Sequence, residues 1–358
     1  MAITIDTPQG VDALTEFVTF HDTVYAQRAA RWTSFLPLEL PILTGESPFV
    51  RGRRVRPFWA RENRRMVARV LAVIDERYQK HWNEKLGHTL MFEALPGTRE
   101  AVKQLMDEAC EWLAGQGAEA ARAGFGMMEF PFVIDAYEPL PPPFIKHNPP
   151  YYHCLLKDAG FESEQGWVDY KIRVCPELKT RWESALEASR RAGYSIVPLG
   201  EVEPGKRIPL FTELWNECFA RHWGYTPFIP EEVDLLMQSL EPAGVLETSV
   251  FAYQGEEPVG VLWVVPDVSA TAATAPGREI REEEKLNLLG IGVRAAARGR
   301  GVNLAMSAYA YLECVKRGQT YASYTLVLDD NWPSRRTGEK LGGEACANYL
   351  VYRRNFRH

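Results

Sequence analysis

The sequence predicts an α/β (α+β) protein built from two similar halves, each with a central sheet flanked by helices. The chain has 358 residues, more than one hydrophobic core usually serves, so two domains are expected. Segments with the two-residue alternation of strands are interleaved with segments of helical spacing. The order of these segments in the first half recurs in the second half, which predicts two copies of one architecture.

The first half starts with a strand hairpin around the turn Glu62-Asn63-Arg64 and continues with an amphipathic helix capped by Thr98. Its last helix is expected to stop at Gly160. The expected elements are strands 54–61, 65–74 and 89–95, helix 98–114, a short strand 126–130, a proline-rich loop 139–143 and helix 153–159.

A charged segment of helical spacing, 176–192, separates the halves, and Gly193 is its expected stop. We interpret it as a linker helix between a first domain, 1–175, and a second domain, 193–358. The second domain contains a hairpin around the turn 254–258. Its other expected elements are strand 194–199, helices near 209–223 and 230–240, hairpin strands 249–253 and 259–265, a mobile loop 270–277, helix 302–317, strand 321–328 and a short helix before Gly342-Gly343.

The composition is that of an ordinary globular protein, with 46% hydrophobic and 25% charged residues. Neither the N-terminus nor any later stretch has the apolar run of a signal peptide or membrane span, so a cytoplasmic protein without a membrane partner is expected. The net charge of −6 argues against a nucleic-acid partner. The basic cluster at 51–56 is interpreted as a solvated loop and strand edge.

The six cysteines and seven histidines are scattered along the chain. The cysteines form no close pairs, which is typical of reduced, buried thiols. The histidines show no metal-ligand spacing, so no metal site is expected.

The segment Arg298-Gly299-Arg300-Gly301 is the clearest functional signal. It follows an apolar strand and opens a helical stretch. Glycines let the backbone come close to a ligand, a helix N-terminus offers unpaired N–H donors, and the arginines add full positive charge. This layout is suited to binding a pyrophosphate, although glycine-rich turns and helix caps use the same residues.

The order of hairpin, strand, glycine-rich turn, helix, strand, short helix and final strand resembles the GNAT superfamily of N-acetyltransferases. The family's motif Gln/Arg-x-x-Gly-x-Gly/Ala falls on Arg298, Gly301 and Asn303, with asparagine in place of the last small residue. The first half resembles the same family through Asn148 and the helix that ends at Gly160-Phe161. Its loop 94–99 is short and poor in glycine, which indicates a copy that is degenerate for coenzyme binding.

This resemblance implies tandem domains, each a mixed, mostly antiparallel sheet flanked by helices. It also implies an N-acyltransferase in which an amine attacks the thioester of an acyl-CoA, usually acetyl-CoA, directly. The implied partner is a small-molecule or peptide amine, and oligomerisation is left open. The coenzyme is expected to contact Leu289, Ile291, Val293, Arg298, Gly299, Arg300, Gly301, Val302, Asn303, Asn331 and Ser334.

The catalytic acid and base are less clear from the sequence. Many members of the family have a tyrosine seven residues after the motif asparagine, but Gly338 and Leu155 occupy these positions here. Tyr324 is the candidate acid and Glu284 the candidate base. The plain alternative is that Tyr324 belongs to the core and Glu284 is a solvated charge.

Aromatic residues gather after the first helix of the second domain. Trp223, Tyr225 and Phe228 are the candidate contacts for the acceptor. Trp215 and Phe219, four residues apart, are interpreted as the buried face of that helix.

Two alternatives to an acyl-CoA-dependent enzyme stay open. One is an aminoacyl-tRNA-dependent transferase of tandem GNAT fold, against which the Arg298–Gly301 turn argues. The other is a non-catalytic acyl-CoA sensor or scaffold, which the missing tyrosine at 338 favours.

Overall fold

The chain divides into two units whose boundaries do not follow the order of the sequence. The computed structural model describes residues 2–145 and 147–356. Unit 1 comprises 1–167, 271–279 and 347–358, and unit 2 comprises 168–270 and 280–346.

Unit 1 is built around the antiparallel strands β3 (Arg53–Glu62), β4 (Arg65–Asp75) and β5 (Leu86–Ala94). The turn between β3 and β4 places Asn63 and Arg64 at positive φ, as a tight hairpin requires. Its other elements are β1 (Ile3–Asp6), α1 (Gly10–Val24), β2 (Ala30–Trp32), α2 (Leu36–Thr44), α3 (Glu76–Trp82), α4 (Arg99–Gly115), β6 (Ala120–Ala123), β7 (Phe132–Val133), α5 (Tyr152–Asp158), β12 (Ala272–Thr274) and the end of β15 (Gly343–Asn355).

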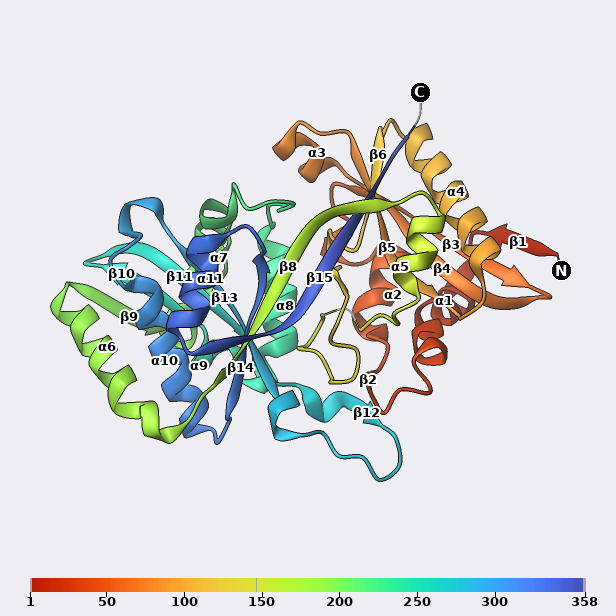
Figure 1. The fold of residues 1–358 in the computed structure, drawn as a ribbon. Helices are drawn as coiled ribbons and strands as arrows, with labels where there is room; N and C mark the ends of the chain where they lie inside the picture. Colours follow the sequence, from red (N-terminus) through yellow and green to blue (C-terminus); the bar gives the residue numbers. More distant parts are fainter. Residues whose placement is uncertain (1, 146, 357–358) are drawn as a thin grey trace. The chain divides into compact units, whose positions relative to one another are not determined.

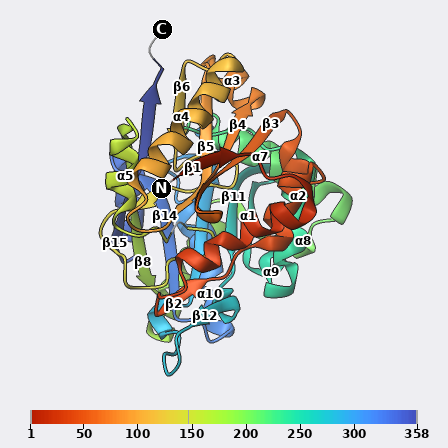
Figure 2. The same cartoon turned by 90° about the vertical axis from the view of Figure 1, so that its right-hand side faces the viewer.

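Helices cover both faces of this sheet. Val70 lies in the hydrophobic core that also contains Val102 and Leu105 of α4. The neighbouring Arg69 donates to the main-chain carbonyls of Phe17 and Val18 in α1. Successive side chains of a strand point to opposite faces, so α4 and α1 cover different faces, and α2 lies beside α1 (Figures 1 and 2). Because both faces are covered, β4 is buried along almost its whole length.

Unit 2, like unit 1, has a central sheet flanked by helices. The antiparallel strands β9 (Tyr194–Pro198), β10 (Val250–Gln254), β11 (Glu257–Val265) and β13 (Leu286–Val293) continue into the parallel strand β14 (Tyr321–Leu328). The remaining elements are α6 (Lys179–Arg191), α7 (Pro204–Phe219), α8 (Pro230–Leu240), α9 (Val245–Thr248), α10 (Val302–Lys316), α11 (Trp332–Lys340) and part of β8 (Glu162–Arg173).

Each unit takes its last strand from the other half of the sequence. In unit 1 the C-terminal end of β15 pairs with β6, with Tyr352 opposite Ala123 (Figure 1). In unit 2 the strand next to β14 is β8, which directly follows the last helix of unit 1. The domain boundaries expected from the sequence therefore differ from the observed units.

The segment expected to be a linker helix belongs to unit 2. Helix α6 packs against α10, and its Trp182 is buried with its ring 4.9 Å from that of Tyr311. Its many charged residues make the segment look solvated in the sequence, but Trp182, Ala185 and Leu186 pack against the core of unit 2.

Two further expectations are corrected. The strand after α4 is β6 at 120–123, while 126–130 contains one isolated bridge between Gly126 and Glu129. Gly124 and Gly126 both have positive φ, which breaks an extended strand there. Part of the loop expected at 270–277 forms β12, which pairs with β2.

Candidate functional site

The centre of the site expected in unit 2 is the point where β13 and β14 separate. Their parallel pairing runs over four residue pairs, from Leu286–Tyr321 to Leu289–Tyr324. Beyond Leu289, β13 continues beside β11 as far as Val293. Main-chain N–H and C=O groups on the facing edges of the two strands are therefore available for hydrogen bonds to another extended chain.

The glycine-rich turn lies at the open end of this pair. Gly299 and Gly301 have φ of +76° and +81°, in the left-handed region that favours glycine. Gly301 is the N-cap of α10, and no side chain among the described residues caps that helix. The first N–H groups of α10, beginning at Val302 and Asn303, thus have no intrahelical acceptor.

The polar side chains around this turn are partly engaged within unit 2. Arg298 is exposed and donates from Nε to the carbonyl of Val293 at 2.9 Å, and Arg300 is exposed. The Asn303 amide donates to Thr337 Oγ1 on α11 at 3.4 Å. Asn331 caps α11 by accepting from the Ser334 N–H at 3.3 Å.

The candidate acid Tyr324 belongs to the last paired position of β14. Its side chain is buried and forms a hydrogen bond with Ser334, and burial raises the pKa of its hydroxyl. A Cβ at Gly338 would lie 3.0 Å from the Tyr170 ring and 3.1 Å from the Tyr324 ring. Two tyrosines from neighbouring strands therefore fill the space in which a side chain at 338 would begin.

The candidate base Glu284 is not free for proton transfer. It is buried and accepts from both the main-chain N–H and the guanidinium of Arg281, at 3.0 and 3.2 Å. It precedes Leu286, where the paired end of β13 starts. This placement argues for a structural role, as a cap of the turn at 282–284.

Helix α7 covers β13 with aromatic side chains. A Cβ at Gly290 would lie 2.6 Å from the Trp215 ring, and a Cβ at Gly292 would lie 2.8 Å from Cys218 and 3.2 Å from the Phe219 ring. The rings of Trp215 and Phe219 stack with centroids 4.4 Å apart. This contact was not predicted from the sequence, although the alternating glycines at 290 and 292 could have indicated that another element packs closely against the strand.

The expected acceptor contacts follow α7 in a loop tied to it by Asn216. The Asn216 side-chain oxygen accepts from the Tyr225 hydroxyl and from the Phe228 N–H, the latter at 2.9 Å. Trp223, Tyr225 and Phe228 are all half-buried. The structure thus holds these rings at the end of α7 with part of each ring accessible.

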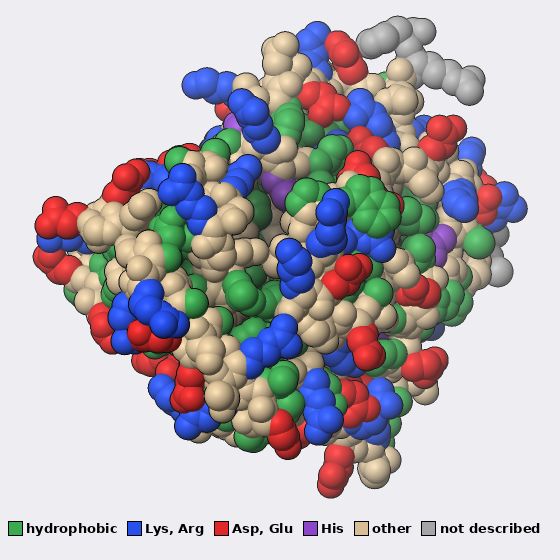
Figure 3. Space-filling view, turned by 60° about the vertical axis from the view of Figure 1, so that its left-hand side comes forward, with side chains coloured by type: hydrophobic (Ala, Val, Ile, Leu, Met, Phe, Trp, Pro, Cys, Tyr) green, Lys and Arg blue, Asp and Glu red, His purple; other side chains and the backbone are tan. Residues whose placement is uncertain are grey.

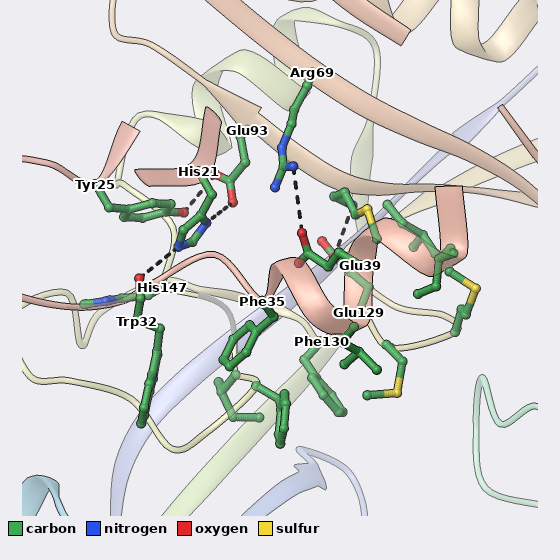
Figure 4. A pocket seen from close by; sticks show the side chains of 18 residues that line it. His21, Tyr25, Trp32, Phe35, Glu39, Arg69, Glu93, Glu129, Phe130 and His147 are labelled. Atoms are coloured by element: carbon green, nitrogen blue, oxygen red, sulfur yellow. Dashed lines mark hydrogen bonds and ion pairs between the residues drawn. The ribbon is translucent and has the colours of Figure 1, made fainter. Parts of the chain in front are cut away.

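Unit 1 contains a cavity that sequence reasoning missed. Its volume is about 100 Å³, and it lies among α1, α2, the end of β5, the segment 127–130 and residues 144, 145 and 147 (Figure 4). Its lining combines polar and apolar side chains: His21, Tyr25, Trp32, Phe35, Leu38, Glu39, Ile42, Arg69, Leu90, Met91, Glu93, Met127, Met128, Glu129, Phe130, Phe144, Ile145 and His147.

Glu93 is the best-anchored polar group of this cavity. It is 3% exposed, accepts from the hydroxyls of Tyr25 and Tyr152 at 3.0 and 2.6 Å, and lies 3.0 Å from His21 Nδ1. Burial and the adjacent Glu93 carboxylate raise the pKa of both tyrosines well above the ordinary value. The carboxylate therefore joins α1, β5 and α5 at the base of the cavity.

None of the helices at 2–145 and 147–356 is long and apolar enough to cross a membrane. Over the same ranges, His, Cys, Asp and Glu side chains form no group of three or more arranged to hold a metal ion. Acidic and basic side chains are interspersed over the face drawn in Figure 3.

No protein-family model matches the chain. A curated protein described as a bacterial ceramide synthase, from Caulobacter vibrioides (strain NA1000 / CB15N), is 22% identical over 328 residues. The match covers 86% of this chain and 85% of that protein.

Several solved structures resemble the chain over almost its whole length. A tandem GNAT protein from the clavulanic acid biosynthesis pathway has a TM-score of 0.60 at 12% identity, covering 99% of this chain and 98% of that one. A GCN5-related N-acetyltransferase from Sphaerobacter thermophilus has a TM-score of 0.54 at 14% identity, with coverages of 99% and 96%.

A third structure contains a GCN5-related glucosamine N-acetyltransferase region within a fungal multi-domain GH3 β-N-acetylglucosaminidase. It has a TM-score of 0.59 at 14% identity, and this chain spans 98% of its own length but 38% of that protein. These likenesses confirm the predicted tandem GNAT fold, with mostly antiparallel sheets flanked by helices.

Proposed function

We propose that this chain, which has the tandem GNAT fold, is an acyl-CoA-dependent N-acyltransferase whose coenzyme binds to unit 2. The observation that supports it most is the separation of β13 and β14 beside the uncapped N-terminus of α10. Unit 1 has a similar parallel pair, β5 and β6, but β5 and α4 are joined by the short segment 95–98 with one glycine. The proposal therefore assigns the pyrophosphate to unit 2 alone.

The proposed coenzyme contacts divide by type. The pyrophosphate accepts from the N–H groups of 299–303 and pairs with Arg298 and Arg300. The extended pantetheine arm pairs with the main chain at Leu289, Ile291 and Val293, and Asn331 and Ser334 lie on the β14 side. Ile291 and Val293 are partly buried beside the core, so their main chains rather than their side chains are the proposed contacts.

The proposed reaction is direct acyl transfer. A neutral amine nitrogen attacks the thioester carbonyl carbon, a C–N bond forms, and the C–S bond breaks to release the coenzyme thiolate, while the amine loses a proton to solvent. Tyr324 is the proposed acid for the thiolate, because a tyrosine hydroxyl is protonated at neutral pH and Tyr324 belongs to the last residue pair before β13 and β14 separate. Glu284 receives no role in this scheme, since it already pairs with Arg281.

The name of the curated relative suggests the acceptor class. A ceramide is an amide of a fatty acid and a long-chain amino alcohol, so its formation by acyl transfer uses an amine acceptor. We therefore take a long-chain amino alcohol as acceptor and a long-chain acyl-CoA as donor. Acetyl-CoA is the second candidate donor, because two of the solved structures are described as N-acetyltransferases. Trp223, Tyr225 and Phe228 are the proposed acceptor contacts.

The first experiment is calorimetry of palmitoyl-CoA and acetyl-CoA binding to the wild type and to the double variant Arg298→Ala, Gly301→Ala. Loss of charge-assisted hydrogen bonds to the pyrophosphate is expected to weaken binding by tenfold or more, about 1.5–3 kcal/mol. The double variant Gly277→Ala, Arg278→Ala is the matched control: Gly277 has a similar positive φ of +79° and lies outside the proposed site.

Turnover is then measured by mass spectrometry of the amide formed from sphinganine. Tyr324→Phe is expected to bind the coenzyme normally and to lower turnover by about 10²-fold. Failure of the wild type to bind either coenzyme would overturn the acyl-CoA proposal and favour the tRNA-dependent alternative. Coenzyme binding without amide formation from any amine would instead favour the sensor.

A further inference from the structure

The cavity of unit 1 contains more negative than positive charge. Glu39, Glu93 and Glu129 all line it, and Arg69 is the one Lys or Arg side chain among the described residues of the lining. Glu93 is satisfied by two tyrosine hydroxyls and faces His21. Glu129, from the segment after β6, accepts from the Met91 N–H at 3.2 Å, and Glu39 lies on α2.

Arg69 forms a long ion pair with Glu39 but no hydrogen bond. It is 2% exposed and points into the cavity from β4 (Figure 4), but its Nη1 donates to the carbonyls of Phe17 and Val18 at 2.6 and 3.0 Å. The same Nη1 lies 3.9 Å from Glu39 Oε2, too far for a hydrogen bond. Arg69 Nε is buried and has no hydrogen-bond partner among the described residues.

Glu39 is consequently a carboxylate with unused acceptor capacity. Its Oε2 is buried without a hydrogen bond to any of the described residues. Burial raises the pKa of Glu39, and nearby Glu129 and Glu93 raise it further, against the lowering effect of Arg69 and His21. A buried carboxylate oxygen without a donor costs stability, and a cationic donor placed beside it would offset that cost.

Most of the other side chains of the lining are apolar. Phe35 and Phe144 pack with ring centroids 5.2 Å apart, and Met127 and Met128 lie on the segment beside them. Methionine side chains adapt to ligands of varied shape. A ligand of this cavity therefore combines a hydrogen-bonding cation with a hydrocarbon chain.

We propose that the cavity of unit 1 binds the ammonium group of an amphiphilic primary amine, with Glu39 as the principal partner and the hydrocarbon chain against Phe35, Leu38 and Met127. The charge excess excludes a carboxylate ligand, which would meet three like charges. A neutral alcohol fits the apolar lining and can donate a hydrogen bond to Glu39, but it brings no positive charge to offset that of the carboxylate. The volume of about 100 Å³ suits an ammonium head and its first few carbons.

This proposal goes beyond acyl transfer, because it assigns a ligand to unit 1 whether or not unit 2 binds coenzyme. It is tested without acyl-CoA, by calorimetry of n-hexylammonium binding to the full chain at pH 8. The expected result is saturable binding to the wild type and a loss of about tenfold or more in Glu39→Gln, which keeps the size of the side chain and removes its charge.

Glu46→Gln is the matched control, since it removes the same charge from an exposed residue seven positions later that does not line the cavity. Its affinity is expected to equal that of the wild type. Hexan-1-ol and hexanoate test the charge requirement, and both are expected to bind at least tenfold more weakly than hexylammonium.

Three results would overturn the proposal: no binding of hexylammonium to the wild type, equal binding to Glu39→Gln, or hexan-1-ol binding as tightly as the amine. None of them bears on coenzyme binding to unit 2, so failure here is distinguishable from failure of the proposed acyl transfer.

Discussion

Two glutamates of the same cavity have different roles. Glu93 accepts two tyrosine hydrogen bonds and fastens three elements of unit 1 together. Glu39, on α2, has an oxygen without such a partner. In the sequence both are single acidic residues among apolar neighbours, and nothing local distinguishes them. The difference arises from which hydroxyls the fold brings to each carboxylate.

Glu39→Gln is expected to stabilise the protein above neutral pH. The pKa of Glu39 is raised in the folded state, so that state binds more protons than the unfolded chain between the ordinary and the raised value. Stability therefore falls as pH rises through this window. The groups that face Glu39 are Arg69, His21, Glu129 and Glu93.

We expect the free energy of unfolding of Glu39→Gln to exceed that of the wild type by on the order of 1 kcal/mol at pH 8, the typical cost of a buried unsatisfied polar group. This difference is expected to disappear below the ordinary glutamate pKa. Urea unfolding at pH 8 and pH 4 measures it, with Glu46→Gln expected within about 0.5 kcal/mol of the wild type. A loss of stability at pH 8 would show that Glu39 is a stabilising partner of Arg69.

At the scale of elements, β13 depends on the helix that covers it. Gly290 and Gly292 leave room for Trp215 and Phe219 of α7, whose end is also joined to the strand by Arg294, paired with Glu213 and Glu217 at 2.8 Å. The ring of Trp215 is packed between Phe211 and Phe219, with centroids 5.4 and 4.4 Å away. The aromatic side chains of α7 therefore fix the position of β13, the strand whose main chain is proposed to bind pantetheine.

Gly290→Ala is expected to destabilise unit 2 by about 1–3 kcal/mol, because the new Cβ would overlap the confined Trp215 ring. Tryptophan fluorescence during thermal unfolding reports both the stability and the ring's surroundings. Gly205→Ala, in the first turn of α7 with open space around its Cβ, is the control and is expected to be neutral or slightly stabilising. Equal melting temperatures for Gly290→Ala and the wild type would mean that Trp215 moves aside freely.

At the scale of the whole molecule, the two halves of the sequence exchange their last strands. Tyr352, near the C-terminus, is buried in unit 1 beside Phe132, with ring centroids 6.1 Å apart, and its hydroxyl lies 2.7 Å from His153 Nδ1. Trp182, which precedes the predicted second domain, is buried in unit 2. Stability of each unit therefore depends on residues from the other half of the chain.

Tyr352→Ala is expected to weaken unit 1, and Trp182→Ala unit 2, each by about 3–5 kcal/mol as for other buried aromatic side chains. Hydrogen exchange followed by mass spectrometry localises each effect. Faster exchange is expected in 86–123 for the first variant and in 302–328 for the second. The reverse pattern, or an effect of Tyr352→Ala confined to 193–356, would contradict the strand exchange.

The sequence by itself determined most of the local structure. The hairpin of β10 and β11, helices α8 and α10, and strand β14 form within a few residues of the predicted limits. The reason is that side-chain periodicity and caps act over neighbouring residues. The order of these elements was also sufficient to predict the tandem GNAT fold, and the turn at 298–301 was recognisable because glycines mark positive φ.

Tertiary structure alone decided the pairing of the last strands and the cavity of unit 1. Both β8 and β15 follow a short helix that ends in glycine, so their local patterns suit either sheet. The cavity joins His21, Glu39, Arg69, Glu93 and Glu129, which are far apart in the sequence and separately resemble ordinary surface or core positions. Contacts between distant residues carry no local periodicity, and for that reason only the folded chain reveals them.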